Sequence, residues 1–392
     1  MRDAIISYRV FNKKFNSEIK NLTKELVASE CNKFKGNIFV SNKNQIKYLK
    51  PNIFWNEANR SPIGFNLDTI KIQLNDLIPS GSGYKIFQHG YQSWSYSTSY
   101  AANEKDISPS LEFLRYSQEN IYSNHSGKQG NFLSESFTCL YSHSTNSGFV
   151  VGVIVESDPG VRFQVQLTLE GRIEDLSAIL DYHCSPNLKP NSKLSTPELI
   201  FMPFQGSPEV FIAKYFDLFS KNIEIPELSK KIPTGWCSWY YYYTNISEKI
   251  ILDNLKAIQD KKLPIQFFQV DDGYQKTIGD WLTTNDDFAF GMKGIADEIK
   301  NAGYQPGIWL APFLVRKDSE FFQKYPEAVL KDESGEPVPA LWNPLWGKGY
   351  TYCLDTTHPR SKEFLTNVFN ADTVNPIYVN AGCFILCNGF VK

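Results

Sequence analysis

The sequence of 392 residues carries 40 basic and 42 acidic side chains and has a net charge of −2. This balance provides no electrostatic attraction to nucleic acid and no basic block for an anionic membrane surface. With 42% apolar and 21% charged residues the chain has a globular composition, and its length suggests about two or three domains. The longest apolar stretch, near 149–155, is far shorter than the roughly 20 residues that a membrane-spanning helix needs.

The N-terminus has no apolar run before its first lysines, so it does not have the pattern of a signal peptide. The seven cysteines and five histidines follow neither a disulfide framework nor a metal-ligand spacing. We therefore expect a cytoplasmic protein without a metal or another cofactor, and without nucleic-acid or membrane partners.

Residues 1–228 have the pattern of an all-β domain. Residues 69–74 and 161–169 alternate apolar and polar side chains, the period of a half-buried strand, and 149–155 is typical of a fully buried strand. Turn sequences rich in Pro, Gly and Asn separate these runs, and a helix is suggested near 208–218. Short strands with frequent turns predict an N-terminal β-sandwich.

Strands and helices alternate after a linker-like stretch at 225–233. Strands are predicted to end near Trp239, Val270 and Leu310, and helices to lie at 245–258, around 295–303, at 319–330 and at 361–369. Asn245 would open the first of these helices, with Glu248 as its capping-box partner. A spacing of roughly 35 residues per unit predicts βαβ crossovers, in either a (β/α)8 barrel or an open doubly wound sheet.

Three clusters of aromatic and acidic residues follow the ends of the three predicted strands. They are Gly-Trp-Cys-Ser-Trp-Tyr-Tyr-Tyr-Tyr at 235–243, Gln-Val-Asp-Asp-Gly-Tyr at 269–274 with Gly-Asp-Trp at 279–281, and Gly-Ile-Trp-Leu-Ala-Pro-Phe at 307–313. In a parallel barrel the carboxyl ends of the strands form the active-site face. These clusters therefore mark a candidate ligand site.

Asp271 and Asp272 are the most informative pair in these clusters. Two carboxylates at the end of an apolar strand need partners, and sugar hydroxyls suit the several acceptor positions of an ionised carboxylate. The same Asp-Asp-Gly sequence is also a good turn, and Trp309 could equally pack at a barrel rim. Trp94, in a polar loop of the N-terminal half, could stack on a sugar or pack between domains.

The three clusters, together with Leu-Asp-Thr-Thr-His-Pro at 354–359 and Tyr-Gln-Ser-Trp at 91–94, resemble motifs of glycoside hydrolase family 36, the α-galactosidases (melibiases) of clan D. The resemblance runs from about 233 to 369 and is weak over most of 1–230. It implies a multidomain β plus α/β protein, with a β-sandwich followed by the first part of a (β/α)8 TIM barrel. It further implies hydrolysis of terminal α-linked galactose, as in melibiose and raffinose, with retention of configuration.

By motif position, the resemblance implies that Asp271 and Asp272 hydrogen-bond galactose hydroxyls. It implies that Trp309 lines the sugar pocket and that Trp94 and Tyr240 close its rim. These are substrate-binding roles.

The chain departs from the family after residue 370. A retaining glycosidase needs two carboxylates about 5–5.5 Å apart, and the resemblance would supply the nucleophile from a Lys-x-Asp motif on a fourth barrel strand. Residues 371–392 contain no such motif. We therefore expect about three βα units at 229–370, a tail unrelated to the family, and no catalytic residue in this chain. A frameshift or wrong junction near residue 370 is one hypothesis for the tail.

Three functions remain open at this point. The chain is an α-galactosidase by descent that lacks both catalytic acids, or a galactoside-binding pseudoenzyme or gene fragment. The third is a relative acting on another α-linked sugar, such as α-N-acetylgalactosamine.

Overall fold

The computed structural model describes residues 4–10, 13–19, 34–55, 65–91, 95–106, 127–155, 159–188, 193–223, 233–332, 334–370 and 378–381. The chain divides into two compact units, Met1–Glu227 and Leu228–Lys392. Each unit has its own hydrophobic core, so each is described by itself.

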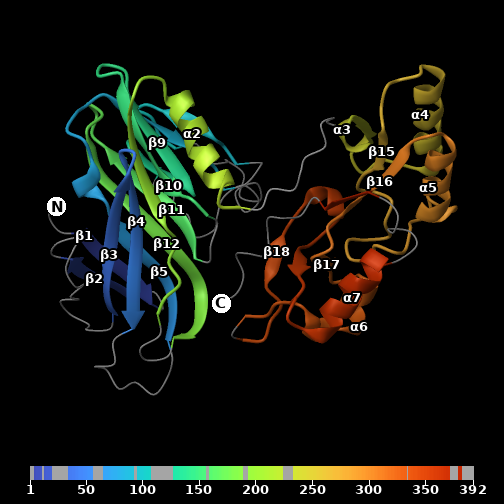
Figure 1. The fold of residues 1–392 in the computed structure, drawn as a ribbon. Helices are drawn as coiled ribbons and strands as arrows, with labels where there is room; N and C mark the ends of the chain where they lie inside the picture. The colour runs from blue at the N-terminus through green and yellow to red at the C-terminus, as the bar shows by residue number, and fades with distance from the viewer. Residues whose placement is uncertain are drawn as a thin grey trace. The chain divides into compact units, whose positions relative to one another are not determined.

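The first unit is built from antiparallel strands in two sheets (Figure 1). The first sheet has the order β2-β1-β5-β12-β11-β8, formed by β1 Ala4–Val10, β2 Lys13–Ile19, β5 Phe65–Gln73, β8 Asn131–Glu135, β11 Gly160–Leu167 and β12 Ile173–Leu188. The second has the order β3-β4-β13-β10-β9-β6-β7, formed by β3 Phe34–Lys43, β4 Ile46–Trp55, β6 Tyr84–Gln88, β7 Thr98–Tyr100, β9 Phe137–Ser142, β10 Ser147–Val153 and β13 Leu199–Gln205. A short 3-10 turn, η1 Asn75–Leu77, follows β5.

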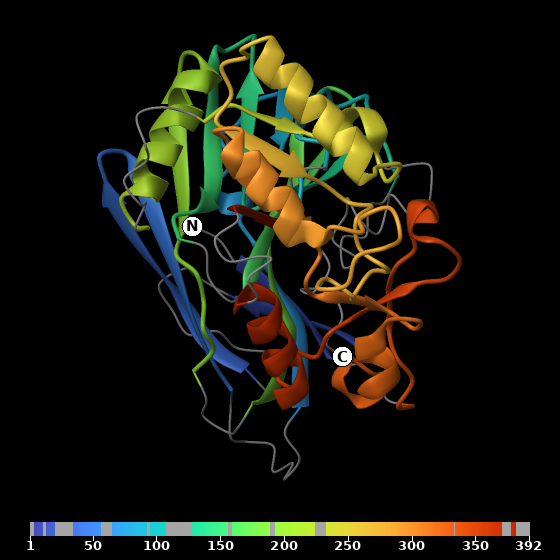
Figure 2. The ribbon, with the colours of Figure 1, turned by 90° about the vertical axis from the view of Figure 1, so that its right-hand side faces the viewer.

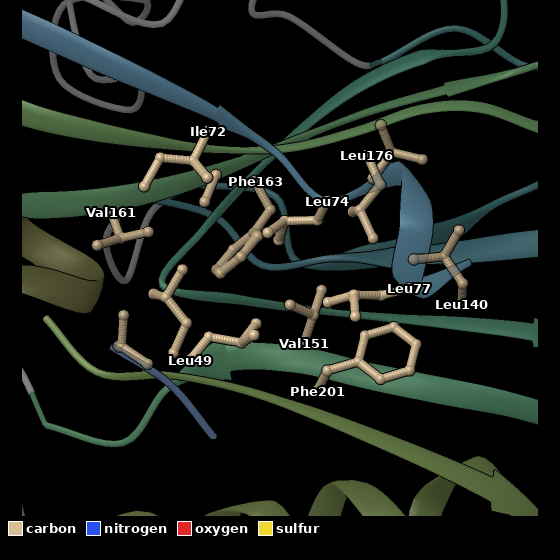
Figure 3. Close-up of a cluster of buried hydrophobic side chains, with 14 of the residues drawn as sticks. Leu49, Ile72, Leu74, Leu77, Leu140, Val151, Val161, Phe163, Leu176 and Phe201 are labelled. Atoms are coloured by element: carbon tan, nitrogen blue, oxygen red, sulfur yellow. The ribbon is translucent and has the colours of Figure 1, made fainter. Parts of the chain in front are cut away.

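One apolar core takes side chains from both sheets. Ile72, Phe163 and Leu176 come from the first sheet, and Val151 and Phe201 from the second, and all are essentially inaccessible to solvent. Figure 3 shows these side chains pointing toward one another. Alternation along each strand supplies this shared core, because every second side chain points to the same face of its sheet.

Helix α2 Pro208–Ser220 packs on the outer face of the second sheet. Its Tyr215 is 1% exposed and donates a hydrogen bond of 2.6 Å from its hydroxyl to the carbonyl of Val153. Val150 and Met202 pack with Tyr215, whereas Val151 faces the shared core. Both faces of β10 are therefore covered, which explains the uninterrupted apolar run that the sequence shows there.

The second unit contains a parallel sheet in the order β14-β15-β16-β20 (Figure 2). The strands are β14 Gly235–Cys237, β15 Phe267–Val270, β16 Gln305–Leu310 and β20 Tyr378–Ala381. Helix α4 Glu248–Asp260 joins β14 to β15, and α5 Gly291–Asn301 joins β15 to β16. Apolar faces of both helices, including Ile251 and Ile295, pack with Phe268 of β15 in one core.

A second, antiparallel sheet of this unit was not foreseen from the sequence. Its order is β17-β19-β18, and the strands are β17 Leu314–Arg316, β18 Pro339–Leu341 and β19 Thr351–Cys353. Helix α6 Glu320–Lys324, the 3-10 turns η2 Pro326–Ala328 and η3 Pro344–Trp346, and helix α7 Pro359–Asn370 complete the segment between β16 and β20. The strands of this sheet are three residues long, too short for a periodic signal.

Several predicted elements differ from the observed ones. Trp239 and Tyr240 lie in the short helix α3 Trp239–Tyr242 rather than on the first strand, which ends at Cys237. Ser247, not Asn245, caps α4, because its hydroxyl accepts a hydrogen bond from the amide of Ile250. The helix predicted at 319–330 ends at Lys324, since Pro326 lacks the amide that a continued helix requires.

A fourth parallel strand follows the segment 229–370, for which about three βα units were expected. β20 comes from the tail that was expected to be unrelated, and it pairs in parallel with β16, with Ile308 opposite Val379 and Leu310 opposite Ala381. The free edge of β16 offers unpaired backbone groups, and a short β-prone segment of the tail pairs with them. The parallel sheet therefore has four strands among the described residues.

Candidate functional site

The site forms where β14 and β15 end side by side. Cys237 is paired with Gln269 in the parallel register, and β15 ends one residue later, at Val270. Ser238 and Asp271, the first residues after the two strands, therefore leave the sheet at the same edge. Asp271 is 7% exposed and Asp272 is 2% exposed. The sheet thus delivers two adjacent, buried carboxylates to its carboxyl edge, as the sequence predicted.

Asp271 is held by residues of its own strand and of the neighbouring one. Its Oδ2 accepts hydrogen bonds from Gln269 Nε2 at 2.8 Å and from the Cys237 thiol at 3.3 Å. Its Oδ1 accepts from the amide of Asp272 at 2.9 Å, and its own amide donates to Ser238 Oγ at 2.9 Å. Three donors on one carboxylate leave about one of its four acceptor positions open.

Asp272 is held by more distant partners. Gln275 Nε2 donates to Oδ1, and the indole Nε1 of Trp346 donates to Oδ2, both at 2.6 Å. Burial raises the pKa of this carboxyl. The hydrogen bonds from Gln275, Trp346 and the Gly273 backbone oppose the rise, and the neighbouring Asp271 adds to it. With the Gly273 backbone amide as a third donor, about one of the four acceptor positions remains open for a ligand.

Two further groups beside the carboxylates stay protonated at neutral pH. The pKa of the Cys237 thiol is raised to about 12, mainly by burial and in addition by Asp271. Burial also raises the pKa of the Tyr274 phenol well above its usual value, with both carboxylates adding to the effect. The thiol can therefore act as a hydrogen donor to Asp271, and the phenol of Tyr274 donates to the carbonyl of Trp309 at 3.2 Å.

Aromatic side chains surround Trp309, which is partly buried at the end of β16. The ring centroid of Trp281 lies 5.9 Å away with an interplanar angle of 74°, and that of Trp346 lies 6.3 Å away at 46°. Trp281 is 2% exposed, and its indole nitrogen has no hydrogen-bond partner within the described structure. An apolar wall with one open donor thus extends from β16.

The structure brings together three of the predicted site residues. Trp346 links Asp272 to Trp309, and Asp271 adjoins Asp272. Tyr240 lies on α3 and is 85% exposed. Trp94 lies outside the described residues.

The sequence reasoning missed Gln275 and Trp346. Gln275 follows Asp272 by three residues, so a turn that folds back could have been suspected from the motif itself. Trp346 is 74 residues away in a segment without periodic pattern, and no local signal points to it.

Among the described residues of both units, no group of three or more His, Cys, Asp or Glu side chains is arranged to hold a metal ion. Over the same described ranges, no helix is long and apolar enough to cross a membrane.

Comparison with known proteins matches this architecture to carbohydrate-active enzymes. The Melibiase family model matches residues 194–342. An α-galactosidase of Lactobacillus acidophilus is 25% identical over 232 residues, which cover 56% of this chain and 31% of that enzyme. The chain is therefore an α-galactosidase-like protein, and it matches less than a third of the length of that relative.

Solved structures of α-galactosidases are also similar to this chain. An α-galactosidase of Thermus thermophilus, in complex with p-nitrophenyl α-D-galactopyranoside, matches with a TM-score of 0.61 and 26% identity over 88% of this chain and 63% of that one. A family 36 α-galactosidase of Geobacillus stearothermophilus, in complex with stachyose, has the same fold with a TM-score of 0.57 and 14% identity, over 94% of this chain and 48% of that one. Among α-galactosidases, the chain is similar to those of glycoside hydrolase family 36.

Proposed function

We propose that this chain binds the terminal α-linked galactosyl group of oligosaccharides at the carboxyl edge of its parallel sheet. The observation that carries the proposal is the pair Asp271 and Asp272, both more than nine-tenths buried and both retaining open acceptor positions. Ionised carboxylates accept strong, charge-assisted hydrogen bonds from hydroxyl groups. A sugar presents several such donors on one ring.

The aromatic residues complete the proposed site. Trp309, with Trp281 and Trp346 around it, supplies an apolar surface for the carbon-bound face of the ring. We assign Tyr240 to the rim, as the family resemblance implies. The proposed layout is a β-sandwich followed by the first part of a (β/α)8 barrel, which the sequential order of the parallel strands supports.

The proposed reaction of the whole protein is hydrolysis of terminal α-galactosides such as those in melibiose and raffinose, with retention of configuration. Such hydrolysis needs a nucleophile and an acid/base about 5–5.5 Å apart. The contacts of Asp271 and Asp272 suit binding roles, and the sequence contains no Lys-x-Asp motif. For the 392-residue chain we therefore propose galactoside binding without turnover.

As a galactoside binder without turnover, the chain would be a pseudoenzyme. One alternative uses the same edge of the sheet: a preference for α-N-acetylgalactosamine over galactose. Competition between methyl α-galactoside and its N-acetylamino counterpart separates this alternative from the proposal.

Isothermal titration calorimetry of the purified chain tests the binding. We expect saturable binding of melibiose and methyl α-galactoside, and weaker binding of methyl α-glucoside, which differs in the orientation of one hydroxyl. Asp272→Asn should weaken binding about tenfold or more, because a hydrogen bond to a charged group contributes about 1.5–3 kcal/mol. Asp286→Asn, which changes an exposed acid after the same strand, is the matched control. Absence of galactoside binding by the folded chain would overturn the proposal.

Release of p-nitrophenol from p-nitrophenyl α-galactoside tests the absence of turnover. We expect no release above the rate without protein. Turnover that Asp271→Asn abolishes would contradict the assignment and make the carboxylate pair catalytic.

A further inference from the structure

The indole donor on Asp272 comes from a part of the unit that is remote in sequence. Trp346 lies in the segment between β18 and β19 of the small antiparallel sheet, and its Nε1 reaches Oδ2 of Asp272 at 2.6 Å. We propose that Trp346 is a positioning residue for Asp272 and that the Arg316–Asp318 ion pair holds Trp346 in place. This inference rests on the proposed galactoside site.

The segment that carries Trp346 is built to present one side chain. Asn343 starts a 3-10 turn: its side-chain Oδ1 accepts from the amide of Leu345 at 3.0 Å, and its carbonyl accepts from the amide of Trp346 at 3.0 Å. Gly347 then adopts a φ of 86°, a conformation that suits glycine, and turns the chain away. Local hydrogen bonds thus set the backbone of Trp346 but not its distance from Asp272.

Arg316 supplies the missing anchor. Its side chain is 12% exposed, and its guanidinium donates to the carbonyl of Trp346 and, at 3.2 Å, to the carbonyl of Lys348. The carbonyls on either side of Gly347 are therefore fixed to the end of β17. Because Arg316 belongs to the small sheet, that sheet determines where the indole lies.

Asp318 in turn fixes the guanidinium. It accepts from Arg316 Nε at 2.8 Å and from Nη2 at 3.0 Å, a two-point contact that sets the plane of the group. The hydrogen bond and charge of Arg316 lower the pKa of Asp318, so the pair stays ionised at neutral pH. A chain of charge-assisted contacts thus runs from Asp318 through Arg316 to the backbone of Trp346.

Trp346 also contacts the proposed sugar surface, because its ring lies 6.3 Å from that of Trp309. One side chain therefore sets both the direction of the Asp272 carboxylate and the edge of the aromatic wall. Loss of the indole N–H would remove the restraint on Oδ2 and leave Gln275 as the side-chain donor on Oδ1, so the sugar would have to complete the orientation of Asp272 on binding.

Trp346→Phe tests the role, since it keeps an aromatic ring and removes the donor. We expect methyl α-galactoside to bind about tenfold more weakly, from the value of a hydrogen bond to a charged group. Tyr350→Phe, which removes a hydroxyl from an exposed ring four residues further on, should bind as the unmodified chain does. Asp318→Asn should weaken binding in the same direction without touching the site. Binding by Trp346→Phe that equals that of the unmodified chain would overturn the proposal.

The pH dependence separates positioning from loss of packing. The indole hydrogen bond lowers the pKa of Asp272, whereas Asp271 and burial raise it, and Tyr274 stays protonated throughout. Without the donor, the loss of binding on acidification should therefore begin at a higher pH in Trp346→Phe than in the unmodified chain. An unshifted acid limb together with weaker binding would indicate a purely structural role and would count against the proposal.

A readout without sugar distinguishes this inference from the proposed function. In a chain labelled with ¹⁵N-tryptophan, the indole resonance of Trp346, assigned by its loss in Trp346→Phe, should move as Asp272 titrates and should stop moving in Asp272→Asn. If no galactoside binds, the proposed function fails, and this resonance still decides the positioning role. A Trp346 resonance that is unaffected by Asp272→Asn would refute it.

Discussion

The ion pair between Arg162 and Asp181 inside the first unit offers a sharp test of the fold. The two residues lie on the adjacent strands β11 and β12 and are 3% and 2% exposed. Arg162 donates from Nη2 to Asp181 Oδ1 at 2.6 Å and from Nε to Oδ2. Burial lowers the pKa of the guanidinium, but Asp181 outweighs that effect, so the pKa is raised and the charge is retained.

Asp181→Ala leaves that charge buried without its carboxylate. Breaking a buried pair in this way costs about 3–5 kcal/mol. Glu135 also attracts Arg162 and would compensate in part, so we expect a loss near the lower limit, about 3 kcal/mol. The double variant Arg162→Met with Asp181→Leu should recover most of the loss, because an apolar pair of similar volume needs no charge compensation.

Hydrogen–deuterium exchange with peptide-level mass spectrometry measures this loss in the first unit alone. Peptides from β11 and β12 should exchange about 100-fold faster in Asp181→Ala, since each 1.4 kcal/mol is a factor of ten. Glu170→Ala is the matched control, because Glu170 and Arg172 form an exposed contact at 3.9 Å that contributes little. Equal exchange in Asp181→Ala and Glu170→Ala would refute the reasoning.

Three further predictions concern the candidate site. Burial raises the pKa of Asp272, so its ionised acceptor form is present above that raised pKa and is lost as the pH falls through it. Calorimetry should therefore show galactoside binding weakening at a higher pH than an ordinary aspartate would give. Weakening that begins only at or below the pKa range of an ordinary aspartate would contradict this. Gly273→Ala should lower the thermal stability and weaken binding, because φ at this position is 120° and an added Cβ would lie 2.5 Å from the carbonyl oxygen of Thr244. Backbone strain alone costs about 1–3 kcal/mol. Gly335→Ala, with a φ of 85° and open space around it, is the control that measures the backbone strain without the steric clash. Cys237 should react with iodoacetamide far more slowly at pH 8 than a free cysteine, because burial, and to a lesser extent Asp271, raises its pKa to about 12. Labelling at the rate of a free thiol would contradict this burial.

The predictable part of the fold is the part with a periodic pattern. The strand predicted to end near Leu310 is β16, which ends in a short apolar run, and the helix around Ile295 and Ile299 is α5, because a spacing of four places both side chains on one buried helix face. Trp239 and Tyr240 were misplaced because a strand of three residues and a helix of four carry no period. The small antiparallel sheet was missed for the same reason.

β20 shows a different limit. The tail was judged by the absence of a catalytic motif, and that absence contains no information about backbone pairing. A parallel strand needs only a short extended segment and a neighbour with an open edge, and β16 provides the edge. Whether residues carry a catalytic motif and whether their backbone forms a strand are separate questions, and β20 answers only the question about the backbone.

The two carboxylates differ in how far their supports can be followed in the sequence. Asp271 takes its donors from Gln269 and Cys237, which a parallel register brings to the same edge once the strands are known. Asp272 takes one donor from Trp346, whose place depends on a sheet of three-residue strands and on the carbonyl contacts of Arg316. The sequence could therefore locate the pair but not distinguish its members. Asp271 is supported from its own sheet and Asp272 from a segment 74 residues away, so the orientation of Asp272 is the one that the strand register alone does not determine.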